Sequence, residues 1–140
     1  MPIAEKKSLL HKIKNDCIKK SKRYKLRYIR LKKWDDRIDV TISFLNATNI
    51  ALLICGFTFQ PILFGCIACS SGSLVLSRVQ QTYNFKHRYS THQNTCNQYN
   101  DISREITNTL YRNHMTNEQL EDFLEYINSK LSIIEDTQIL

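Results

Sequence analysis

Apolar side chains dominate the middle of this chain. Residues 38–79 carry only two charged side chains, whereas both flanks are rich in charge. A helix needs roughly 17 to 25 apolar residues to cross a hydrocarbon core about 30 Å thick. The pattern therefore predicts two transmembrane helices, over 40–59 and 62–79, joined by a tight turn at Gln60-Pro61.

The alternative is a hairpin buried inside a soluble all-helical domain, because the same stretch also holds many Asn, Ser and Thr residues. A chain of 140 residues builds one modest core, and its charged flanks are too hydrophilic to wrap such a hairpin on all sides. We therefore expect an integral membrane protein. A cleaved signal peptide is not expected, since the first apolar run begins near residue 38.

Small and polar residues recur at helical spacing in both predicted spans. Such rows let two helices approach closely in lipid, and Asn and Ser side chains then bond across the contact. Folding the chain at 60–61 brings Asn49 level with Ser71 and Gly72, and Asn46 level with residues 73–75. The residues expected at this contact are Ser43, Asn46, Ala47, Asn49, Gly65, Ala68, Gly72 and Ser73. A pore lined by the two asparagines is the weaker alternative, because hydroxyl partners are near.

The two flanks have opposite net charge. Before the hairpin, fourteen Lys and Arg stand against four acids, a net charge of +10, whereas from Gln80 onward five basic residues stand against eight acids. Short basic segments next to a span stay on the cytosolic side. We therefore expect both termini on the cytosolic side of a membrane or its topological equivalent.

The basic arm, residues 1–37, has a helical pattern of its own. Its apolar residues recur at three- and four-residue steps while Lys and Arg fill the other faces. No Gly or Pro occurs between Ile3 and Cys55, so we expect one helix to run from the arm into the first span. Polybasic helices next to a membrane attract anionic headgroups. The residues expected at the lipid surface are Lys19, Lys20, Lys22, Arg23, Lys25, Arg27, Arg30, Lys32, Lys33 and Trp34.

The same arm is compatible with nucleic-acid binding, because basic residues alternate with Tyr24, Tyr28 and Trp34, which could stack on bases. No recognised nucleic-acid-binding motif accompanies them. The aromatic residues also fall on the apolar stripe of the arm. We expect them to pack against a partner helix, and we do not expect a nucleic acid as partner.

The region 80–140 predicts two further helices and completes an all-α fold. A long helix is expected over about 80–112, and a terminal helix over about 117–135 that Thr116 or Asn117 caps. The long helix pairs with the arm as an antiparallel stalk or bundle. Its seam consists of Tyr24, Tyr28, Leu31, Phe85, Tyr89, His92, Cys96, Tyr99, Ile106 and Leu110. We expect the apolar face of the terminal helix to dock on this stalk.

Catalytic and metal chemistry find little support. Cys66 and Cys69 form a CxxC inside an apolar span with no second pair, which is a weak zinc or redox signal. His92 and Cys96 share a helix face, but packing in the seam explains them better than a metal does. Three glycines in the whole chain do not build a phosphate-cradling loop. We expect no enzyme activity, no metal and no cofactor.

Two segments of the long and terminal helices stand out beside the basic arm and the two short spans. They are Tyr99-Asn-Asp-Ile102-Ser-Arg-Glu105-Ile106 and Phe123-Leu-Glu-Tyr126-Ile-Asn-Ser-Lys130-Leu131. With them the arrangement resembles the SLATT group of two-span membrane proteins, and in particular the small two-span proteins of large nucleocytoplasmic DNA viruses. The resemblance covers about residues 15–135. This chain departs from the pattern in the length of its arm and in the asparagines of its first span.

The resemblance implies two functions. In bacteria such proteins are thought to act as membrane effectors that oligomerise into a pore when a partner signals. In viruses a structural role is implied, with the hairpin in an internal membrane of the virion and the stalk against capsid proteins. We expect the structural, scaffolding role with capsid or other structural proteins as partners. The homo-oligomeric pore is the alternative, and a membrane-tethered nucleic-acid-binding protein is the second alternative.

Overall fold

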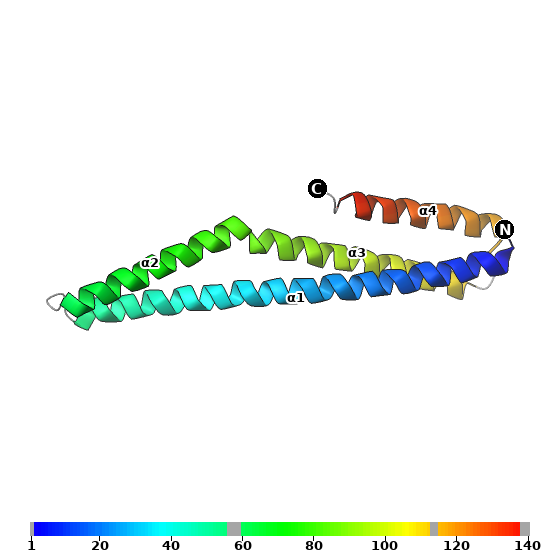
Figure 1. The fold of residues 1–140 in the computed structure, drawn as a ribbon. Coiled ribbons are helices and arrows are strands. Elements are labelled where there is room, and N and C mark those ends of the chain that lie inside the picture. The colour runs from blue at the N-terminus through cyan, green and yellow to red at the C-terminus, as the bar shows by residue number, and fades with distance from the viewer. Residues whose placement is uncertain (1, 56–59, 113–114, 138–140) are drawn as a thin grey trace. The chain divides into compact units, whose positions relative to one another are not determined.

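The computed structural model describes residues 2–55, 60–112 and 115–137. Over these residues the chain is helical and contains no strand, which confirms the predicted all-α class. Figure 1 shows the four helices in chain order: α1 (Ile3–Cys55), α2 (Gln60–Tyr83), α3 (Phe85–Tyr111) and α4 (Asn117–Asp136).

The first helix, α1, runs without interruption through 53 residues. The prediction that the basic arm continues into the first span as one helix is therefore confirmed. The reason is local, because no Gly or Pro breaks the helix and Lys, Arg and Leu favour it. Residues 56–59, which the prediction included in the first span, lie outside the described residues.

The second helix, α2, differs from its prediction at both ends. It begins at Gln60, so the turn predicted at 60–61 is wrong. Pro61 lies in the first turn of α2, where its missing N–H costs nothing. The helix also passes the expected boundary at 79/80 and ends at Tyr83, because the break before α3 lies at Asn84, whose φ is 44°. Asn adopts this left-handed conformation more readily than most residues.

The last helix, α4, begins where the sequence predicts. The Thr116 hydroxyl accepts a hydrogen bond from the Gln119 N–H at 3.3 Å, and the Gln119 side chain accepts one from the Thr116 N–H at 3.1 Å. This reciprocal capping box satisfies two N–H groups that the helix itself leaves unpaired. Of the two cap residues predicted, Thr116 and Asn117, the structure has Thr116.

The chain divides into two compact units. We name residues 1–27 with 91–140 the terminal unit, and residues 28–90 the central unit. The boundaries expected at 37/38 and 79/80 both fall inside the central unit.

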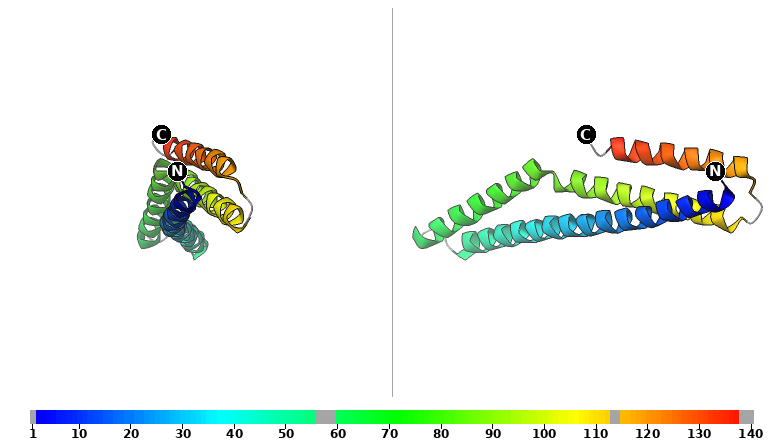
Figure 2. Two further views of the ribbon diagram at one scale, coloured as in Figure 1. Left: turned by 90° about the vertical axis from the view of Figure 1, so that its right-hand side faces the viewer. Right: turned by 45° about the vertical axis from the view of Figure 1, so that its right-hand side comes forward.

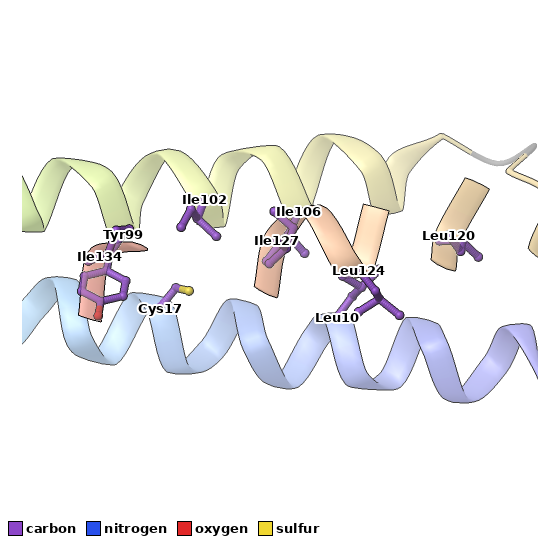
Figure 3. Packing of buried hydrophobic residues seen from close by; sticks show 9 residues of the cluster. All are labelled: Leu10, Cys17, Tyr99, Ile102, Ile106, Leu120, Leu124, Ile127 and Ile134. Atoms are coloured by element: carbon purple, nitrogen blue, oxygen red, sulfur yellow. The ribbon is translucent and has the colours of Figure 1, made fainter. Parts of the chain in front are cut away.

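The terminal unit is a three-helix bundle of the first part of α1 with α3 and α4, which stay together in both views of Figure 2. Its core is apolar and receives side chains from all three helices, as Figure 3 shows. The buried residues are Leu10, Cys17, Tyr99, Ile102, Ile106, Leu120, Leu124, Ile127 and Ile134.

Contacts in the terminal unit fix the direction of its helices. Ser21 of α1 bonds to Asn100 of α3, and the next turn of α1 brings Tyr24 against His92. Residue numbers thus rise along α1 while they fall along α3, so this pair is antiparallel. Ion pairs join Lys6 to Glu121 and Lys20 to Glu135, so α1 and α4 run parallel.

The predicted seam residues fall into two groups. Cys96, Tyr99 and Ile106 are buried, whereas the other seven are half-buried. The Tyr24 and Tyr99 rings stack with centroids 5.9 Å apart in the terminal unit. Ile102, which is also buried, was not predicted for the seam. A strict heptad seam is narrow, and α3 buries a wider face because α4 packs on it as well.

Candidate functional site: the polar contact between α1 and α2

Two hydrogen bonds between side chains join α1 to α2 within the apolar stretch of the central unit. The Ser73 hydroxyl donates to Asn46 Oδ1 at 2.9 Å, and Asn49 Nδ2 donates to the Ser70 hydroxyl at 2.8 Å. The two helices are antiparallel in the central unit, since the residue with the higher number on α1, Asn49, bonds to the residue with the lower number on α2, Ser70. Asn46 meets Ser73 as the sequence predicts, while Asn49 lies one residue from its predicted level.

Glycines of α2 let leucines of α1 approach closely. A Cβ added to Gly65 would lie 3.1 Å from Cδ1 of Leu52, and one added to Gly72 would lie 3.4 Å from Cδ1 of Leu45. The glycines thus lie at the contact. Their partners are large side chains rather than a second row of small residues.

Three other small residues expected at this contact are exposed. Ser43 and Ala47 lie away from α2, and the Ser43 hydroxyl donates to the backbone carbonyl of Asp39 in its own helix. Ala68 is also exposed, and its neighbour Cys69 is half-buried instead. Adjacent positions on a helix differ by about 100°. A row chosen by residue size alone can therefore miss the face that packs.

A second polar contact lies between Asp35, Asp39 and Gln80. The side-chain amide of Gln80 donates to one carboxylate oxygen of each aspartate, both at 2.7 Å. Asp35 is only 3% exposed. The sequence did not predict this contact, because Trp34 rather than Asp35 was expected on the packed face of the helix. Trp34 is exposed, and the guanidinium of Arg37 lies 5.9 Å from the centroid of its ring.

A signal for the missed contact exists in the sequence. Asp35 and Asp39 are four residues apart, so they share a helix face, and they directly precede the apolar stretch. A hydrogen-bond donor is then expected opposite them on the next helix, and Gln80 is such a residue at the end of the second apolar stretch.

Large apolar side chains cover the outer faces of both helices in the central unit. Those exposed on α1 are Val40, Phe44, Ile50, Leu53 and Ile54, and those on α2 are Leu63, Phe64, Ile67, Leu74 and Val75. By length and composition the described residues include two helices able to cross a membrane, and almost none of their apolar windows is buried.

The α1–α2 contact also has a polar side. A groove of about 510 Å³ is lined by Leu74 and by the polar or charged residues Asn46, Ser70, Ser73, Ser77, Arg78 and Gln81. Nearby, Oδ1 of Asn49 is buried and has no hydrogen-bond partner among the residues that the structure describes.

Most residues expected at the lipid surface are exposed. In the central unit they are Arg30, Lys32, Lys33 and Trp34, and in the terminal unit they are Lys19, Lys22, Arg23, Lys25 and Arg27. The guanidinium of Arg27 also lies 5.7 Å from the Tyr24 ring centroid.

Lys20 is the exception to this exposure. It is half-buried, and its amino group lies 2.5 Å from Glu135 Oε1 and 5.5 Å from the centroid of the Tyr99 ring. The hydrogen bond with Glu135 raises the pKa of Lys20 above its ordinary 10.5. Lys20 therefore holds α4 to α1 instead of facing outward.

The residues weighed for metal chemistry serve packing. The ring of His92 lies 5.7 Å from that of Tyr24, and the thiol of Cys96 lies 3.3 Å from the Ser21 hydroxyl. Cys66 is buried and Cys69 half-buried, both as free thiols. Across 2–55, 60–112 and 115–137 no three His, Cys, Asp or Glu side chains are grouped to hold a metal ion.

Comparison with protein-family models, with curated proteins and with solved structures finds no match for this chain.

Proposed function

We propose that this chain is a two-span membrane anchor that presents a helical bundle to protein partners. The observation that carries the proposal is the exposure of large apolar side chains on both helices of the central unit, such as Ile54 at 80% and Phe64 at 70%. A contiguous apolar surface of this kind is rare on monomers in water. Lipid acyl chains cover it without cost.

Pairing of the polar side chains supports the same reading. Hydrocarbon offers no hydrogen-bond partners, so a polar group within it needs a partner from the protein. Asn46 and Asn49 each bond to a serine of the neighbouring helix. Thr41, Ser43 and Thr48 donate to backbone carbonyls of their own helix, so most of the polar side chains of the described hairpin have a partner within the protein.

Exposed cations next to the first span support an orientation with both termini on the cytosolic side. Arg30, Lys32 and Lys33 precede the span and are exposed. Each such cation contributes on the order of 1 kcal/mol at an anionic surface. Trp34, also exposed, is the type of residue found at the headgroup level of a membrane.

The test is extraction of the full-length chain from cell membranes. We expect it to float with membranes and to resist alkaline carbonate, whereas detergent releases it. Replacing Ile54 and Phe64 by Lys places charges in the apolar surface, and we expect carbonate then to release the chain. The matched control is Leu26→Lys, which changes an exposed apolar residue outside the spans and should leave the chain in the membrane. Release of the unaltered chain by carbonate contradicts the proposal.

The resemblance to the viral two-span proteins suggests where the anchor acts. There it would be a structural component of a particle with an internal membrane. Purified particles would then contain the chain, and detergent but not salt would release it. Particles that lack the chain would contradict this setting while leaving the anchor itself intact.

A pore is the second candidate, and the polar groove beside Asn46 favours it. If several copies surround water, the groove would face it. Liposomes containing the chain would then leak a small dye, and Asn46→Leu with Asn49→Leu would stop the leak. Tight liposomes over a range of protein densities would exclude this candidate.

A further inference from the structure

The terminal unit carries opposite charges on two of its helices. Exposed cations lie along α1, whereas α4 holds six acidic residues and one lysine. Two ion pairs, Lys6–Glu121 and Lys20–Glu135, already use this difference inside the bundle. Most of the charge on both helices remains outside these pairs.

On α1 the exposed surface of the terminal unit is mainly basic. Lys12, Lys19, Lys22 and Arg23 are exposed and take part in no ion pair within the described part of the chain. Leu26 follows them and is 66% exposed. We name these five residues the basic face. Asp16 is the one acidic residue between Lys12 and Leu26.

On α4 the corresponding surface is acidic. Glu118, Asp122, Glu125 and Asp136 are exposed and likewise form no ion pair with any residue that the structure places. Ile133 lies among them and is 61% exposed. We name these five residues the acidic face. Each face thus combines four like charges with one exposed aliphatic side chain.

We infer that the terminal unit associates with a second copy of this chain, the basic face of one copy against the acidic face of the other. Opposite charges attract across such a contact, and the exposed Leu26 and Ile133 supply apolar area at each face. A polyanion such as a nucleic acid or an anionic membrane would neutralise only the basic face and would be repelled by the acidic one. A second copy is the partner that satisfies both.

The test is a charge swap in the full-length chain in a mild detergent, with oligomeric state measured by sedimentation. One variant, Lys19→Glu with Lys22→Glu and Arg23→Glu, makes both faces acidic. The other, Glu118→Lys with Asp122→Lys and Glu125→Lys, makes both faces basic. We expect each variant alone to associate at least about tenfold more weakly than the unaltered chain, since reversed charges repel across the contact. Mixed together, the two variants should associate again, because each acidic face meets a basic one.

Several outcomes overturn the inference. The unaltered chain is expected to associate at about 20 mM salt and to dissociate towards about 500 mM, so a monomer at low salt contradicts it. Association that survives in either variant alone, or a mixture that stays dissociated, also contradicts it. Circular dichroism checks that both variants remain helical, and the matched control Lys25→Glu with Arg27→Glu, outside the named face, should weaken association less. None of these variants touches the spans, so carbonate extraction reports on the membrane anchor separately.

Discussion

Lys6 shows how one charged residue can be part of a small core. Its side chain is buried, and its amino group donates to Glu121 Oε2 at 2.6 Å and to the Asn117 carbonyl at 3.1 Å. The aliphatic stem covers apolar surface while the charged end reaches partners at the start of α4. Lys6 therefore fixes the position at which α4 begins to pack.

Replacing Lys6 by Ala tests this role. We expect the variant to lower the free energy of unfolding by about 1 to 3 kcal/mol, because a packed stem and two hydrogen bonds are lost and the Asn117 carbonyl loses a donor. Chemical denaturation followed by circular dichroism measures the loss. Lys25→Ala removes an exposed lysine of the same helix outside the basic face and should change stability by less than about 0.5 kcal/mol. Equal losses in the two variants would contradict the role of Lys6.

At the scale of the element, the contact between α1 and α2 depends on which positions of α2 face its partner. Gly65 faces Leu52 closely, whereas Ala68 is exposed. Gly65→Leu should therefore destabilise the contact by about 1 to 3 kcal/mol through overpacking. Ala68→Leu adds the same kind of side chain to the outer face and should cost less than about 0.5 kcal/mol. Unfolding in mixed micelles titrated with dodecyl sulfate measures both, and a larger cost at Ala68 would contradict the described packing.

The same helices show which features could be predicted from the sequence and which could not. The absence of Gly and Pro was enough to predict α1 as one helix, and the cap candidates Thr116 and Asn117 were enough to predict where α4 starts. The choice between Ala68 and Cys69, or between Trp34 and Asp35, depends on how two helices cross, and residue type does not contain that information. Trp34 is the more apolar of its pair, yet the buried residue is Asp35, because Gln80 supplies a hydrogen-bond donor.

At the scale of the whole molecule, ion pairs between helices make stability depend on pH. Donation from Lys6 and its positive charge lower the pKa of Glu121 below its ordinary 4.5. A lowered pKa in the folded state means that the pair contributes stability above about pH 4.5, which is lost as the pH falls through the lowered pKa. Lys20 and Lys130 have raised pKa values because they bond to Glu135 and Glu105. Their contribution to stability is fully present below about pH 10.5 and is lost as the pH rises through the raised pKa.

We therefore expect the melting temperature to fall between about pH 5 and about pH 3. Part of this fall should disappear in Glu121→Gln, which cannot be ionised and so has no carboxylate to lose. Asp101→Asn is the matched control, because Asp101 is exposed and forms no ion pair in the part of the chain described, and it should keep the full dependence on pH. Thermal unfolding followed by circular dichroism measures both, and an unchanged acid loss in Glu121→Gln would contradict the prediction.

The terminal unit combines residues 1–27 with 91–140, so it cannot fold until nearly the whole chain has been synthesised. Lys6 bonds to residues that lie 111 and 115 positions further along the chain. While a ribosome makes the chain, Leu10 and Cys17 have no α3 or α4 to cover them, and the whole central unit emerges before they do. Pairings of such long range close slowly and leave apolar surface open to other chains. The apolar face of α1 in the terminal unit therefore stays uncovered until α4 has been synthesised, and we expect a chaperone or the membrane surface to shield it during that time.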